Sequence, residues 1–108
     1  MNTQKFIEAQ LGIKTNRQEY YVTVGTSPDT ILPNNPNRIS WFISNLQGQT
    51  VYVSDQPNVS TTTGAFLGVG AALSSGWHQD GLSVTNPVYG ISSATGTKLY
   101  VLETVIIQ

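Results

Sequence analysis

The sequence predicts an all-β fold, an antiparallel β-sandwich or jelly-roll-like barrel, preceded by a short N-terminal arm or helix. Three observations lead to this fold class. Apolar and polar residues alternate with a period of two from Glu19 onward, which is the pattern of half-buried strands. Turn-forming residues recur at intervals of about 8 to 12 residues, which is typical of sandwiches and barrels. The chain has 108 residues and is 39% hydrophobic, enough for the thin core of one small domain.

The N-terminal part of the chain, residues 1–18, differs in character from the rest. Phe6, Ile7 and Leu11 follow the spacing of one helical face, and Gly12 is a suitable residue to end such a helix. A helix shorter than about 12 to 15 residues is marginal by itself in water, because nucleation is costly. We therefore expect residues 1–18 to form an arm that packs through these three apolar side chains, either on its own domain or on a neighbouring subunit.

Residues 19–108 are predicted to form the sandwich domain. In the clearest strand, residues 38–44, apolar side chains alternate toward one face, and Phe42 points to the opposite face. The turn at 45–49 is expected to reverse the chain into a strand at 50–54, forming a hairpin. The residues expected to face the core are Ile39, Trp41, Ile43, Val51, Val53, Leu99 and Val101.

The remaining strands are short and are separated by loops. Prolines and asparagines over residues 28–37 exclude a regular ladder there, apart from a short edge strand at 31–32. Polar residues over 55–64 indicate a surface loop, and Gly68 and Gly70 in an apolar stretch indicate a bulge or a bend. The further expected strands are 19–24, 65–67, 71–73, 82–84, 88–92 and 98–107.

The composition excludes several classes of function. Only 10% of the residues are charged, where about 25% is usual, and 39 Ser, Thr, Asn and Gln residues supply the polar surface instead. A net charge of −1 does not suit nucleic acid, whose phosphates need neutralising. Without cysteine, the chain has no disulfide, thiolate metal ligand or thiol nucleophile. No apolar run has the length of a signal peptide or a membrane span, so we expect no classical export signal and no membrane partner.

The one compact group of residues that could carry chemistry is Trp77-His78-Gln79-Asp80. His78 and Asp80 could supply two metal ligands, but a zinc site needs three or four, and the chain has no other His. No Gly-x-Ser-x-Gly motif is present, so we expect no catalytic, metal-binding or cofactor-binding residues and no enzyme activity. We interpret the tetrapeptide as a surface turn with a half-buried Trp. The alternative is a carbohydrate-binding surface formed by Trp77, His78 and Asp80.

A longer pattern covers about two-thirds of the chain, from Asn37 to Thr104. The residues that carry it are Asn37-Arg38 before an apolar strand that ends at Asn45, Val51-Tyr52-Val53, Val59-Ser60-Thr61 before Gly64, Val88-Tyr89-Gly90-Ile91-Ser92-Ser93, Gly96-Thr97 and Glu103. This pattern resembles small β-sandwich proteins encoded among the structural genes of tailed bacteriophages. The segment 1–18 and the tetrapeptide at 77–80 lie outside it.

The resemblance implies a non-enzymatic virion component, either a capsid decoration (cement) protein or a head or tail accessory protein, packed in many copies. It also implies two kinds of partner: further copies of the chain, in the first instance as a trimer, and other virion proteins such as the major capsid protein. A surface of Ser, Thr, Asn and Gln agrees with this, because unpaired charges are costly to bury between copies. The alternative function is a carbohydrate-binding module on a virion or a cell-surface assembly.

Overall fold

The computed structural model describes residues 2–3, 12 and 14–107. The expected helix and its contact residues Phe6, Ile7 and Leu11 lie outside the described residues, so they stay a prediction. The described chain forms eight strands and two short helices. In order, these are β1 (Lys14–Val24), β2 (Asp29–Leu32), β3 (Arg38–Gln47), β4 (Val51–Ser54), β5 (Ala65–Leu67), β6 (Ala72–Gly76), the one-turn helix α2 (Trp77–Asp80), the 3-10 helix η1 (Gly81–Thr85), β7 (Val88–Ser92) and β8 (Thr97–Ile107).

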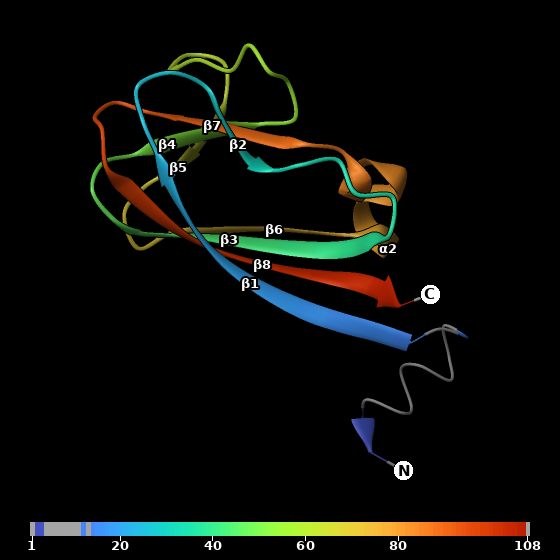
Figure 1. Ribbon diagram of the computed structural model, residues 1–108. Helices are drawn as coiled ribbons and strands as arrows, with labels where there is room; N and C mark the ends of the chain where they lie inside the picture. Colours follow the sequence, from blue (N-terminus) through green and yellow to red (C-terminus); the bar gives the residue numbers. More distant parts are fainter. Residues whose placement is uncertain (1, 4–11, 13, 108) are drawn as a thin grey trace.

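The strands form two four-stranded antiparallel sheets that lie face to face (Figure 1). One sheet has the strand order β1-β8-β3-β6, and the other has the order β2-β7-β4-β5. β1 pairs with β8, β2 with β7, β3 with β6 and β4 with β5, as though one long hairpin had been rolled up. This is the arrangement of a jelly roll, so the all-β sandwich expected from the sequence is confirmed.

The largest departures from the expected boundaries occur in two segments. β1 begins at Lys14 and not near residue 19, and its first residues pair with the end of β8. Residues 82–84 form η1 and not a strand. The reason is local: the hydroxyls of Ser83 and Thr85 donate to main-chain carbonyl oxygens three residues earlier, which favours a tight helical turn.

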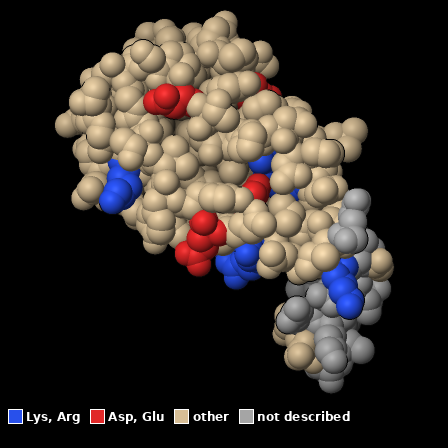
Figure 2. All heavy atoms as spheres, in the orientation of Figure 1, with Lys and Arg blue, Asp and Glu red and all other residues tan. Residues whose placement is uncertain are grey.

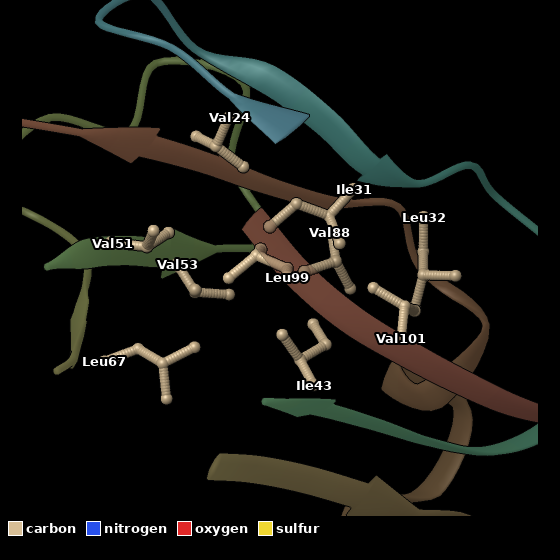
Figure 3. Close-up of a cluster of buried hydrophobic side chains, with 10 residues drawn as sticks. All are labelled: Val24, Ile31, Leu32, Ile43, Val51, Val53, Leu67, Val88, Leu99 and Val101. Atoms are coloured by element: carbon tan, nitrogen blue, oxygen red, sulfur yellow. The ribbon is translucent and has the colours of Figure 1, made fainter. Parts of the chain in front are cut away.

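The core lies between the sheets, where inward-facing aliphatic side chains from both sheets pack together (Figure 3). Its buried members are Val24, Ile31, Leu32, Ile43, Val51, Val53, Leu67, Val88, Leu99 and Val101. Five of the seven residues that the alternating pattern places in the core are among them. The inner faces predicted for β3, β4 and β8 are therefore confirmed.

The start of β3 departs from the predicted alternation because it contains a bulge. The register with β8 shifts between Arg38 and Ser40, so Arg38 is buried, and Ile39, expected in the core, lies outside the core cluster and is only half-buried. Trp41 packs against the core cluster but is also only half-buried. The bulge brings the Arg38 guanidinium to the buried carboxylate of Glu103 on β8, so the inward position at the start of β3 is taken by Arg38 and not by Ile39.

The expected hairpin between residues 38–44 and 50–54 is wrong. β3 pairs with β8 and β6, whereas β4 lies in the other sheet and pairs with β5 and β7. Gly48 lies in the turn where the chain crosses between the sheets, with a φ of +109°, and a Cβ there would lie 2.7 Å from Thr97 Oγ1. Turn-forming residues indicate that a chain changes direction, but they do not identify the strand with which it pairs next.

Arg38 and Glu103 form a buried ion pair, with 2.7 Å between Arg38 Nε and Glu103 Oε2. Tyr20 Oη donates a hydrogen bond to Glu103 Oε1, also at 2.7 Å. The other guanidinium nitrogens of Arg38 donate to the main-chain carbonyl oxygens of Pro33, Val84 and Asn86. This one ion pair therefore connects β1, β3 and β8 to the loop before β3 and to the segment around η1.

We expect Arg38→Met to lower the free energy of unfolding by about 3 to 5 kcal/mol, because it leaves the Glu103 carboxylate buried without its partner. The double variant Arg38→Met/Glu103→Leu removes both charges and should recover part of that loss. Urea unfolding followed by Trp fluorescence measures both variants. A double variant no more stable than the single one would contradict the explanation by an unpaired buried charge.

Candidate functional site

A pocket of about 310 Å³ opens between the two sheets, on the side where β5 and β6 are the edge strands. We call it the edge pocket. Its apolar wall includes Trp41, Val53, Leu73 and Val88. Its polar lining includes Asp55, Ser75, Asp80 and Ser83. An apolar wall with a few polar groups at the entrance is the usual composition of a ligand or peptide site.

Small inward-facing side chains leave the edge pocket open. Ser75 of β6 lies opposite Trp41 of β3, and Ala65 of β5 lies opposite Val53 of β4. Neither Ser75 nor Ala65 is large enough to fill the space beside Trp41, which therefore forms part of the pocket wall. The sequence contains this signal, but it is readable only once the strand register is known.

The entrance of the edge pocket is acidic. Asp80 is held in place because its Oδ2 accepts hydrogen bonds from Ser75 Oγ at 2.6 Å and from Gly76 N at 3.3 Å. Asp55 lies in the exposed loop after β4. No Lys or Arg occurs among the described residues that line the pocket, so the two carboxylates give its entrance a negative charge.

The three residues of the alternative carbohydrate-binding surface do not converge on one pocket. Asp80 lines the edge pocket, whereas His78 lines a second pocket of about 280 Å³ with Phe42 and Thr104. Trp77 lines neither pocket; it starts α2, is 49% exposed, and has its ring centroid 5.8 Å from that of His78. The tetrapeptide is thus one helical turn at the surface, and its binding of carbohydrate stays a prediction.

Aromatic side chains follow one another across the outer face of the β1-β8-β3-β6 sheet. Tyr21 of β1 lies opposite Tyr100 of β8, with ring centroids 5.7 Å apart, and Tyr100 lies 6.3 Å from Phe42 of β3. We call these three residues the aromatic row. Tyr21 is 65% exposed and Phe42 is 37% exposed. The outward direction that the sequence predicts for Phe42 is confirmed, and the row leaves apolar ring surface in contact with water.

The other sheet carries a smaller aromatic group on its outer face. Tyr52 of β4 lies opposite Phe66 of β5, and their rings meet edge to face at 6.0 Å. Phe66 is 68% exposed. This pair spans two strands, whereas the aromatic row spans three.

Two tyrosines have raised pKa values. The hydrogen bond to the Glu103 carboxylate, followed by burial, raises the pKa of Tyr20. Desolvation, followed by the charge of Glu19, raises the pKa of Tyr100 in the aromatic row. Both phenols therefore stay neutral at physiological pH, so Tyr100 contributes apolar surface and no charge to the row.

The described residues contain no group of three or more His, Asp or Glu side chains placed to hold a metal ion. In the same part of the chain, no helix is long and apolar enough to cross a membrane.

No protein-family model and no curated protein matches the sequence. A comparison with solved structures finds two chains that superpose on this one. One belongs to Bacillus endospore appendages, described as a family of disulfide-linked pili, with a TM-score of 0.58 and 11% identity over 89% of each chain. The other is dTDP-4-dehydrorhamnose 3,5-epimerase from Bacillus anthracis, with a TM-score of 0.44 and 14% identity over 99% of this chain and 62% of that one. With so few identical residues, the likeness to the pilus protein shows a shared fold alone.

The two tryptophans should respond differently to truncation. Trp41→Ala removes a large side chain packed on the core and should lower the free energy of unfolding by about 3 kcal/mol, at the low end of the range for a core Trp. Trp77→Ala should change it by less than about 0.5 kcal/mol, as for other exposed positions. Thermal and urea unfolding followed by circular dichroism test both. Equal losses would show that Trp77 also supports the fold.

Proposed function

We propose that the protein is a non-enzymatic structural subunit that assembles with further copies of itself. The aromatic row carries this proposal, because it exposes ring surface on the outer face of a sheet. Contiguous exposed apolar surface on a small domain typically marks an interaction site. A second copy suits this surface, since it presents the same rings and aromatic rings favour edge-to-face contacts with one another.

The sparse charge of the surface favours close packing of copies. Figure 2 shows only a few Lys, Arg, Asp and Glu side chains scattered over the face in view. On the outer face that carries the aromatic row, the strand alternation places Arg17 and Glu19 beside Tyr21, and Lys98 beside Tyr100. Hydroxyl and ring surface can be buried against another copy without the desolvation penalty of an unpaired charge, whereas these three flanking charges must be paired or stay at the rim of the contact.

The shared fold with the endospore appendage protein supports an assembly role, because that protein forms pili. Those pili are disulfide-linked, and this chain has no cysteine. Copies of this chain would therefore associate through non-covalent contacts, with burial of apolar surface as the main driving force.

The setting that we propose is the virion of a tailed bacteriophage, where the protein decorates the capsid or serves as a head or tail accessory protein beside the major capsid protein. The support is the resemblance carried by residues Asn37 to Thr104. Two residues of that pattern, Arg38 and Glu103, form the buried ion pair, so the pattern includes residues that this fold depends on.

Removing one ring from the aromatic row should weaken self-association. We expect Phe42→Ser to raise the dissociation constant by about 10- to 100-fold, which corresponds to the loss of roughly 1.5 to 3 kcal/mol of apolar burial. Phe66→Ser, an equal change on the outer face of the other sheet, is the matched control. Sedimentation velocity over a concentration series measures both, and it also tests the trimer that the resemblance implies. If the wild type stays monomeric, or if the control weakens association equally, this interface is wrong.

The virion assignment predicts an abundant component of purified particles. Quantitative mass spectrometry of phage particles that carry this gene should find a copy number comparable to that of the major capsid protein. A few copies per particle would indicate an accessory position in the tail or neck. Particles that lack the protein would contradict a virion location, while leaving self-association to be judged by sedimentation.

A further inference from the structure

The edge pocket is not used by the aromatic row, since it opens between the sheets and not on their outer faces. Its wall is apolar where Leu73 and Val88 flank Trp41, and its entrance carries the carboxylates of Asp55 and Asp80. A partner for such a pocket needs an apolar body and a positive charge next to it, because the apolar wall excludes water and the carboxylates favour a cation.

The N-terminal segment of the chain has this complementary chemistry. Lys5 directly precedes Phe6 and Ile7, so a cation and two large apolar residues are adjacent in the sequence. The charges are also divided along the chain. Positions 1–18 contain three Lys or Arg and one Glu, for a side-chain charge of +2, whereas positions 19–108 contain two Lys or Arg and five Asp or Glu, for a charge of −3.

We propose that the edge pocket of one copy receives the N-terminal segment, residues 1–13, of a neighbouring copy. The apolar wall takes the side chains of Phe6 and Ile7, and the acidic entrance takes Lys5. This inference rests on the proposed self-assembly and adds to it a second contact, between the segment of one copy and the pocket of the next.

The segment is long enough to reach an edge pocket, and we assign the contact to a neighbouring copy because the protein is proposed to assemble with itself. The segment joins the body at the start of β1, which is one edge of the β1-β8-β3-β6 sheet, and the pocket lies beside β6, the opposite edge. These edges are about 14 Å apart, three strand spacings. Thirteen residues span about 20 Å as a helix and up to about 45 Å when extended, so either conformation covers this distance. A contact between opposite edges of successive copies is heterologous, so it propagates into a ring or an open chain of subunits.

Cysteine cross-linking tests the contact on the full chain, which has no native cysteine. One single-cysteine variant carries Thr3→Cys in the N-terminal segment, and the other carries Ser83→Cys in the pocket lining. Any disulfide between these two variants joins two molecules. The control replaces Ser83→Cys by Ser93→Cys, an exposed position in the turn between β7 and β8, at the end of the sandwich opposite α2 (Figure 1).

We expect the Thr3→Cys and Ser83→Cys mixture to form the mixed disulfide several times faster than the control mixture. Asp55→Lys should slow its formation by about 2- to 5-fold, the range for loss of an exposed ion pair. Adding Lys5→Glu should restore the rate, because the charges are then exchanged. Asp55 tolerates this change, since its side chain is exposed and accepts a long hydrogen bond from Gln56 Nε2, at 3.4 Å.

Two results would overturn the contact. One is a mixed disulfide that forms no faster than the control disulfide. If sedimentation of the same samples still shows oligomers, only the contact between segment and pocket is wrong. If it shows monomers, the proposed self-assembly fails as well. The other is a Thr3→Cys/Ser83→Cys double variant that closes its disulfide within one chain at high dilution, which would place the segment in its own pocket.

A saccharide is the competing occupant of the edge pocket, given its hydroxyl and carboxylate lining. Galactose is the probe, added to the full chain and to Trp41→Phe in thermal unfolding. Under our proposal galactose leaves the melting temperature of both unchanged. Two results together would overturn the proposal and identify the pocket as a saccharide site. Galactose would raise the melting temperature of the wild type but not that of Trp41→Phe, and it would slow the formation of the mixed disulfide.

Discussion

The buried pair of Arg38 and Glu103 is the interaction on which the rest of this jelly roll depends. A charge inside a small domain is tolerated only when it is paired and hydrogen-bonded, so β3 and β8 must lie side by side, and the chain around Pro33 and Val84 must close over the guanidinium. Among the described strands, only β4 and β5 pair with a direct neighbour in the sequence. Every other pairing joins remote segments, and we infer that the ion pair helps to select one such arrangement over its alternatives.

The same interaction shapes the edge pocket. The bulge that turns Arg38 inward resets the alternation of β3, and it places Trp41 directly opposite Glu103 in the register with β8. On its other side Trp41 lies opposite Ser75, a small residue on a short edge strand. Trp41 thus lies beside the buried Glu103 on the β8 side and beside a small residue on the β6 side, where the pocket opens.

The surface divides into parts with different chemistry. The outer sheet faces present aromatic rings among hydroxyl groups, the edge pocket presents carboxylates above an apolar wall, and Lys and Arg residues are concentrated near the start of the chain. In a monomer, the exposed aromatic rings would stay in contact with water, and few charges would be present to keep the surface hydrated. Packing against further copies, as proposed, would give each part a complementary surface, which is the common reason behind both proposed contacts.

The sequence by itself determined the fold class, the inner faces of β3, β4 and β8 and the outward direction of Phe42, because alternation with a period of two states directly which side chains share a face. It did not determine the partners of β3 and β4, since a turn such as the one at Gly48 looks the same whether the next strand stays in the sheet or crosses to the other. It also could not place Arg38 inside and Ile39 outside, or reveal the edge pocket. Those features depend on a bulge and on a register between residues far apart in the chain, so only the tertiary structure decided them.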